Sequence, residues 1–265
     1  MKKTWPCFIA TLLLASSAWA GLDTFSDTFD SGYVPGSLDG QNGWVRFSDW
    51  SLDWGADRGR DGSGGVHSTN RSVDTSGYYG RDRKPHGMPL DEAVHGEPGM
   101  YLRAEADVYI GVETPEPGVA MKASEASLYL HNGLTAAETT RYIAVGAADN
   151  WGGWSSSGNR FLCWYGDENG FSDWIYYSEH GVMPTSAWYK IGLEWQPTLG
   201  TVQAWGADAE GQTLWQTNFT VNFSHPEVLT NVLIRVRQDK EGKPAALDNV
   251  HVRNGFRRGT HVRVF

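Results

Sequence analysis

Hydrophobic residues recur at every second position along most of this 265-residue sequence, and this alternation limits the possible folds more than any other feature. The segment 100–110 shows it most clearly. One side of this segment would carry Leu102, Ala104, Ala106, Val108 and Ile110, and the other Tyr101, Arg103, Glu105, Asp107 and Tyr109. Because successive side chains of a β-strand point to opposite faces, the pattern predicts a strand whose apolar side is buried.

The same alternation predicts strands elsewhere in the chain. Their inward residues would be Ala126, Leu128 and Leu130; Tyr189, Ile191, Leu193 and Trp195; and Val232, Ile234 and Val236. Shorter candidates lie at 141–147, 160–165, 172–177, 201–205, 213–221 and 247–253. Many strands without helical patterns between them predict an all-β sandwich or barrel. Short helical turns are expected only at 135–139 and 89–94, and the Gly-, Asp- and Ser-rich segment 48–86 is expected to form loops with one or two short strands.

The first 20 residues have the features of a secretory signal peptide. Two lysines precede an apolar run at 7–14, and Ala18-Trp19-Ala20 supplies the small-x-small pattern of a cleavage site. The run is too short to span a bilayer, which takes ~20 residues. We therefore predict that residues 1–20 are a signal peptide and that a soluble protein is secreted, to the periplasm, the cell surface or the medium.

Charge and cysteine content exclude other classes of protein. The formal net charge is −9, and it becomes −11 without the two lysines of the signal peptide. A negative chain is not attracted to phosphate backbones or anionic lipids, so nucleic acid is not expected as a partner. No later segment approaches the length of a membrane span without charges, so membrane insertion is not expected either. Beyond the signal peptide Cys163 is the only cysteine, so no intramolecular disulfide is expected.

Segments at both ends of the predicted mature chain resemble one large family. They are Phe25-Ser26-Asp27-Thr28-Phe29-Asp30-Ser31 with the following 35–44, then 187–195, and finally Ala246-Leu247-Asp248-Asn249-Val250-His251-Val252. These segments are similar to the secreted bacterial members of the concanavalin A-like lectin/glucanase, or laminin G-like, jelly-roll superfamily. The resemblance implies that residues 21–265 form a single antiparallel β-sandwich of the jelly-roll type. Between 48 and 185 the likeness extends only to the alternating strands.

The resemblance also implies a structural calcium ion. In such jelly rolls the first and last strands are adjacent, and an acidic residue of the closing strand often helps to hold calcium near the N-terminal loop. The matching residues are Asp248 and Asp30, with Asp27 or main-chain carbonyls as further ligands, a donor set that suits calcium. Alternatively, Asp30 caps a turn and Asp248 pairs with a nearby Arg or Lys.

No complete catalytic motif is present, so the sequence leaves enzymatic activity open. Glu105-Ala106-Asp107 is the first part of a laminarinase-type motif, but Tyr109 and Ile110 occupy the positions of the third acid. Two solvated acids beside Arg103, such as a local Arg103–Glu105 ion pair, are the simpler interpretation. The outward residues with chemistry suited to a polysaccharide lyase are Arg103, Tyr129, His131, Arg141 and Arg235, but no lyase motif accompanies them.

Aromatic residues give the strongest indication of function. The chain contains 13 Trp and 11 Tyr, and several of them lie in 150–178 among Gly, Ser, Asp and Asn residues, although about half of that set must point into the core. Flat rings beside amides and charged groups suit carbohydrate. If consecutive strands pair, with Tyr142 in the core, one outward face would gather the predicted glycan-binding residues Arg103, Tyr129, His131, Arg141, Trp151 and Trp154.

The sequence therefore predicts a secreted carbohydrate-recognition protein whose partner is a polysaccharide or other glycan. Two alternatives remain open. One is a polysaccharide lyase or glycoside hydrolase acting on the concave face of the same fold, and the other is a non-enzymatic surface or adhesion protein.

Overall fold

A computed structural model describes residues 21–46, 52–68, 76–82, 100–111, 124–132, 141–149, 159–167, 170–171, 176–179, 181–183, 186–221, 229, 231–238 and 245–256. The predicted signal peptide and the two predicted helical turns lie outside these residues. Among the described residues, no helix has the length and hydropathy needed to cross a membrane.

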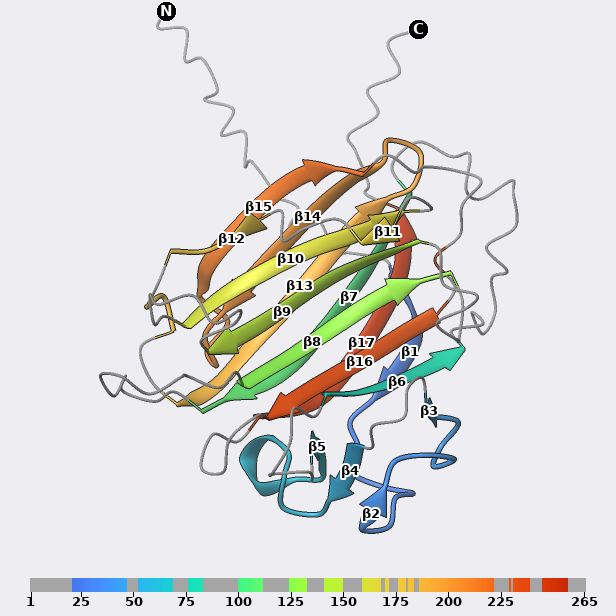
Figure 1. The fold of residues 1–265 in the computed structure, drawn as a ribbon. Coiled ribbons are helices and arrows are strands. Elements are labelled where there is room, and N and C mark those ends of the chain that lie inside the picture. Colours follow the sequence, from blue (N-terminus) through green and yellow to red (C-terminus); the bar gives the residue numbers. More distant parts are fainter. Residues whose placement is uncertain are drawn as a thin grey trace, which may run out of the picture.

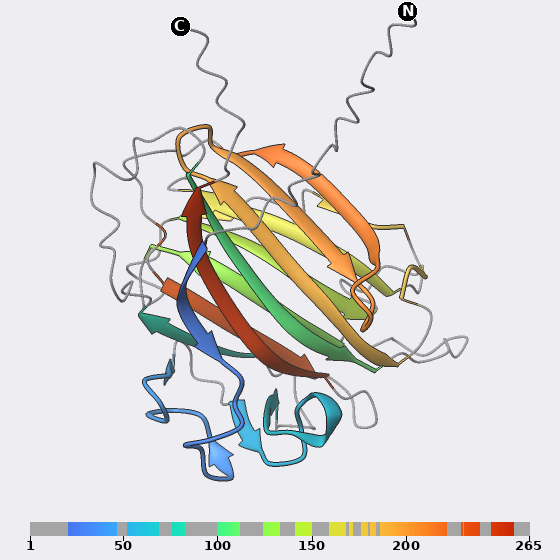
Figure 2. The same cartoon turned by 180° about the vertical axis from the view of Figure 1, so that it is seen from behind.

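The described strands form two antiparallel sheets packed face to face (Figures 1 and 2). The sheet facing the viewer in Figure 1, here called the front sheet, has the order β11 (Gly170–Phe171), β10 (Asn159–Asp167), β9 (Tyr142–Asp149), β8 (Ser124–His131), β16 (Asn231–Gln238), β6 (Ser76–Asp82) and β3 (Val45–Arg46), with β12 (Tyr176–Tyr177) also pairing with β10. This arrangement is the predicted all-β sandwich.

The back sheet, nearest the viewer in Figure 2, contains both ends of the described chain. Its order is β15 (Thr213–Thr220), β14 (Thr201–Ala207), β13 (Ala187–Gln196), β7 (Met100–Ile110), β17 (Ala245–Phe256), β5 (Gly65–Ser68), β4 (Leu52–Gly55) and β2 (Gly36–Ser37), and β1 (Gly21–Asp27) also pairs with β17. A 3-10 turn, η1 (Arg60–Gly62), lies between β4 and β5. The pairing of β1 with β17 agrees with the adjacency of first and last strands that the family resemblance implies.

One hydrophobic core fills the space between the sheets. The alternating residues predicted to point inward on β7, β8, β13 and β16 all belong to it, as does the unpaired Cys163. The ring of Phe161 on the front sheet stacks on Trp215 of the back sheet, with centroids 6.2 Å apart. It also lies over Gly206 of β14, where a Cβ atom would come within 2.3 Å of the ring. Gly206 is therefore required by the close approach of the two sheets.

Two expectations about topology are wrong. Strands β7 and β8 follow each other in sequence but do not pair: β7 pairs with β13 and β17 in the back sheet, and β8 with β16 and β9 in the front sheet. The segment 48–86 contributes three strands, β4, β5 and β6, where one or two were expected. Its alternating stretches are only about four residues long or are interrupted by glycine, which weakens the sequence signal.

The N-terminal segment that resembles the jelly-roll family forms a buried aromatic cluster. The indole of Trp44 donates to Asp27 Oδ2 at 2.9 Å, and the indole of Trp54 donates to the carbonyl of Phe29 at 2.8 Å. The hydroxyl of Tyr33 also donates to Asp27 Oδ2, and its ring stacks on Trp54. These contacts explain why the segment combines aromatic residues with Asp27.

Replacing Gly206 by Ala should lower the free energy of unfolding by about 1–3 kcal/mol, because the new methyl group overlaps the Phe161 ring. Urea denaturation of Gly206→Ala, Phe161→Leu and the double variant measures this. The cost of Gly206→Ala should be smaller in the Phe161→Leu background, where the side chain is shorter. Equal costs in both backgrounds would show that Phe161 does not impose the need for glycine.

Candidate functional site

The outer surface of the front sheet carries side chains that are unusual for the outside of a sheet. The cross-strand register places Glu125, Ser127, Tyr129 and His131 of β8 opposite Arg237, Arg235, Leu233 and Asn231 of β16. On the other side of β8, Tyr142 of β9 lies opposite His131, and Ala144 lies opposite Tyr129. We call this surface the front face; it comprises Glu125, Ser127, Tyr129, His131, Tyr142, Ala144, Ala148, Arg160, Leu162, Trp164, Tyr177, Asn231, Leu233, Arg235 and Arg237.

A buried ion pair lies at one end of the front face. Arg235 Nη1 is 3.1 Å from Glu125 Oε1, and Ser127 Oγ donates to the same oxygen at 2.5 Å. Glu125 is 0% exposed and Arg235 is 8% exposed. The second carboxylate oxygen, Glu125 Oε2, accepts no hydrogen bond from the described residues. Burying an ion pair costs several kcal/mol of desolvation per charge. Packing of the core therefore does not explain why an ion pair is buried on this surface.

Three aromatic rings pack together beside this pair. The Tyr129 ring meets Trp164 edge-on at 5.3 Å between centroids and Tyr142 at 6.0 Å. Leu162, Leu233 and two alanines complete a second hydrophobic cluster, separate from the core. The Tyr142 ring lies across Gly166, where a Cβ atom would come within 2.2 Å of it. The small residues of β9 and β10 thus make room for large rings on this face.

His131 lies at the other end of β8 on the front face. It is 1% exposed, and burial lowers the pKa of its imidazole to about 3. The side chain is therefore neutral at physiological pH, with one ring nitrogen able to donate a hydrogen bond and the other to accept one. A neutral imidazole suits hydroxyl groups better than it suits charged ligands.

The accessible border of the front face is formed by Arg160 and Tyr177. The Arg160 guanidinium lies 4.8 Å from the centre of the Tyr177 ring, and Tyr177 is 57% exposed. Tyr177 is cross-strand from Leu162, which places it beside the cluster of buried rings. An exposed ring and a cation thus lie next to the buried part of the face.

The structure separates the residues predicted to bind glycan. Tyr129 and His131 lie on the front face, but Arg103 is on the outer surface of the back sheet, where its guanidinium pairs with Glu105 at 2.7 Å and covers Trp205 at 4.5 Å. The expected single patch is wrong for Arg103, because the chain crosses between the sheets from β7 to β8. Trp151 and Trp154 lie outside the described residues.

The assignment of faces on β9 also needs correction. Arg141 precedes the strand, and its backbone N–H donates to Asn132 Oδ1 at 3.1 Å. Tyr142, expected in the core, instead points outward onto the front face, and Ile143 and Val145 enter the core. In 141–147 both the odd-numbered positions (Ile143, Val145) and the even-numbered ones (Tyr142, Ala144) carry apolar residues. Alternation alone therefore cannot show which set points into the core.

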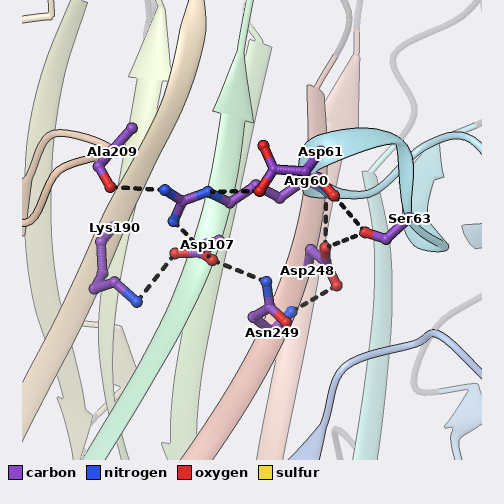
Figure 3. A network of polar contacts seen from close by, with 8 residues as sticks. All are labelled: Arg60, Asp61, Ser63, Asp107, Lys190, Ala209, Asp248 and Asn249. Atoms are coloured by element: carbon purple, nitrogen blue, oxygen red, sulfur yellow. Dashed lines mark hydrogen bonds and ion pairs between the residues drawn. The ribbon is translucent and has the colours of Figure 1, made fainter.

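Asp107 was expected to be a solvated acid on the outside of the back sheet. It does point outward, but it is only 3% exposed and lies 3.3 Å from Arg60 Nη1 and 3.2 Å from Lys190 Nζ (Figure 3). Asn249 Nδ2 donates to it at 2.9 Å. Arg60 belongs to η1, which lies against the outer surface of the back sheet. No local sequence pattern predicts the contact between Arg60 and Asp107. The Arg103–Glu105 pair, by contrast, is present as expected.

Asp30 and Asp248, the predicted calcium ligands, lie at the same end of the sandwich. Asp248 is buried, and its carboxylate accepts hydrogen bonds from the backbone N–H groups of Arg60 and Asn249 and from Ser63 Oγ (Figure 3). Burial raises its pKa to about 6, with the charge of Asp30 acting in the same direction. A hollow of about 490 Å³ lies beside Asp30, lined by residues 26–31, 42 and 43.

The donors for a cation at this end are limited. Both oxygens of Asp27 already accept hydrogen bonds, from Phe29 N, Tyr33 and Trp44. Among the described residues, no group of three or more His, Cys, Asp or Glu side chains converges. Both oxygens of Asp248 likewise accept hydrogen bonds, so a calcium ion, which prefers six to eight oxygen ligands, would share that carboxylate with three donors and take its other ligands from Asp30, main-chain carbonyls and water.

Comparison with known proteins identifies the fold. No protein-family model and no curated protein matches the sequence. Among solved structures, the CBM2 module of the evolved Dit protein of Lactobacillus casei BL23 phage J-1 matches with a TM-score of 0.57 and 8% identity, over 90% of this chain and 98% of that one. Lectin II from Ulex europaeus matches with a TM-score of 0.52 and 11% identity, over 89% and 100% of the two chains.

A lectin from Bauhinia forficata, solved in complex with GalNAc, matches with a TM-score of 0.53 and 6% identity, over 89% of this chain and 99% of that one. At such low identity these similarities establish a lectin-like β-sandwich fold.

The buried, neutral state of His131 should make stability depend on pH. Its pKa is lowered in the folded state, so the unfolded chain binds the proton more tightly between about pH 3 and 6.5. The free energy of unfolding should therefore fall as pH falls through this window, by up to about 1.4 kcal/mol per pH unit from this residue. Urea denaturation of the wild type and His131→Gln at pH 7, 6, 5 and 4 measures the difference in slope. The His131 imidazole NMR signals are identified by their absence from His131→Gln, and their titration near pH 6.5 would contradict the assignment.

Proposed function

We propose that this protein is exported and recognises carbohydrate through its front face. The observation that carries the proposal is the buried polar row of β8, in which Glu125, Ser127 and His131 point away from the core yet are almost fully covered. A sheet surface with only a structural role would be solvated or apolar. The lectin-like fold supports the proposal, although a fold alone does not determine function.

The chemistry of the front face suits a sugar. Carbohydrates present hydroxyl groups that both donate and accept hydrogen bonds, together with apolar C–H faces. The Arg160 guanidinium offers hydrogen-bond donors to such hydroxyl groups at the accessible border of the face. The exposed ring of Tyr177 offers a surface for the C–H faces, and the packed cluster of Tyr129, Tyr142 and Trp164 lies beside it.

Substituting the residues at the accessible border of the front face should weaken glycan binding. Tyr177→Ala and Arg160→Ala should each reduce affinity about tenfold, because each removes one part of the exposed cation–ring pair. Affinities for a polysaccharide panel are measured by isothermal titration calorimetry. Trp188→Ala is the matched control, since it removes a partly exposed ring packed on Tyr109 of the back sheet. Equal affinities for the wild type and both border variants, or a loss only in Trp188→Ala, would contradict the proposal.

A catalytic role for the same face is the second candidate. Glu125 Oε2 accepts no hydrogen bond from the described residues, and a carboxyl group is one that general acid–base chemistry uses. This supports a polysaccharide lyase or glycoside hydrolase as the alternative to pure recognition. Release of reducing ends, or absorbance of unsaturated uronate products, by the wild type but not by Glu125→Gln would establish catalysis.

We also propose that calcium supports the end of the sandwich where Asp30 and Asp248 lie. The ionised form of Asp248 is disfavoured by burial and by the charge of Asp30, and a cation would offset both effects. Bound calcium would supply positive charge that links the loop after β1 to the closing strand. The solvent-exposed Asp30 and the hollow beside it give an ion access.

Calcium should therefore raise the melting temperature, because an ion that binds only the folded state stabilises it by mass action, by about 2.7 kcal/mol at 100 times its Kd. Thermal melts in calcium and in EDTA should differ for the wild type and coincide for Asp30→Asn. Asp57→Asn, an exposed acid of a different loop, serves as control and should keep the response. Identical wild-type melts in both conditions would rule out a stabilising ion.

A further inference from the structure

The strands at the ends of the two sheets differ in length. Three of these end strands, β2, β3 and β11, have two residues each, whereas the fourth, β15, has eight. Among the described strands β15 pairs only with β14, and Figures 1 and 2 show it at the margin of the back sheet. Because alternate N–H and C=O groups of an edge strand point away from its neighbour, β15 offers a long row of hydrogen-bonding groups to another strand.

Strand β15 lacks the residues that usually keep an edge strand from pairing. Residues 213–220 contain no charged side chain and no proline, although the whole chain has a net charge of −9. The register with β14 shifts only near the start of β15 and is regular from Trp215 to Thr220. Strand β1, which pairs only with β17 among the described strands, has two aspartates and a register shift between Asp23 and Phe25. Charges and bulges protect edges, so β1 is protected and β15 is open to a partner.

The sequence of β15 has similar chemistry in both directions from Thr217. Gln216 and Asn218, the residues next to it, both carry amides. Trp215 and Phe219, the next residues out, both carry aromatic rings. In an antiparallel pair of identical strands with a twofold axis at Thr217, Gln216 lies opposite Asn218 of the second copy, and Trp215 lies opposite Phe219 of the second copy. Amide therefore meets amide and ring meets ring, so the strand is complementary to itself.

The side chains of β15 are held in place before any pairing. On the inner side, the Trp215 ring stacks on Phe161 at 6.2 Å and the Phe219 ring on Tyr176 at 4.8 Å between centroids. On the outer side, Asn218 Oδ1 accepts a hydrogen bond from Gln203 in β14 at 3.2 Å, and the Asn218 Nδ2 group keeps two donors. Association with a second copy therefore orders few additional side chains, which lowers its entropic cost.

We propose that β15 is the interface of a homodimer, in which two copies join their back sheets into one continuous antiparallel sheet about a twofold axis at Thr217. This inference rests on the edge strand and does not require the proposed function. If the front face binds glycan, the dimer presents two such faces, because the front sheet takes no part in the pairing. Two linked sites on one polysaccharide would then gain avidity.

Sedimentation velocity of the secreted protein over a range of concentrations tests the dimer and its register. The wild type should form dimers. Gln216→Lys/Asn218→Lys places like charges opposite each other in both amide pairs and should weaken dimerisation at least about tenfold. Gln216→Lys/Asn218→Glu is the matched control, because the same register places Lys opposite Glu in both pairs and should preserve the dimer. Both variants replace Asn218 and lose its bond to Gln203, so the comparison isolates the effect of charge across the interface.

Disulfide cross-linking supplies a second, independent measurement. Thr217→Cys places two cysteines directly opposite each other, with Cα atoms about 4.5–5.5 Å apart, and mild oxidation should give a covalent dimer. Thr220→Cys should not cross-link, because its two copies would lie ~20 Å apart along the strands. The wild type, whose Cys163 is buried, should not cross-link either. The proposal is overturned by a wild type that is monomeric at every concentration, by equal dimerisation of the two charge variants, or by a dimer that Thr217→Cys does not cross-link.

Discussion

A β-bulge in the closing strand determines how the N-terminal part of the chain joins the sandwich. Strand β17 pairs with β7 on one side, but the register shifts between Asp248 and His251. On its other side, the residues before the shift pair with β5 and those after it pair with β1. Asn249 adopts a φ of 51° within the bulge, a conformation that asparagine tolerates better than most residues. One irregular residue thus divides the edge of β17 between two different strands.

The same bulge places the polar side chains that hold η1 on the back sheet. Asp248 accepts a hydrogen bond from the backbone N–H of Arg60 (Figure 3). The side chain of Asn249 donates to Asp107, which also forms an ion pair with the Arg60 side chain. Arg60 also donates to the carbonyl of Ala209, beyond β14. Loop, closing strand and central strand are therefore joined by one network, and the end of the sandwich proposed to bind calcium depends on it.

Sequence alternation predicts the inward residues of the long strands well, because burial of one face is a local consequence of side-chain geometry. Leu128 and Ile191 are in the core as predicted. Alternation cannot show which sheet a strand joins, so Arg103 and Tyr129 were expected to share a face although β7 and β8 lie in different sheets. Nor can it show what covers an outward residue. Asp107 and His131 point outward as predicted but are buried, and the contact of Asp107 with Arg60 spans 47 positions in the sequence.

The two outer surfaces of the sandwich differ in chemistry, and this difference matters more for function than the fold itself. The front face combines packed rings, a buried ion pair and a neutral histidine, whereas the outer surface of the back sheet carries amides, hydroxyls and the ion pairs of Glu105 and Asp107. A crystal structure of the protein with a glycan that it binds tests recognition by the front face most directly. The account predicts sugar atoms in contact with the Tyr177 ring and within hydrogen-bonding distance of Arg160, at the accessible border of the front face. A glycan bound only elsewhere on the molecule, with the front face unchanged, would contradict it.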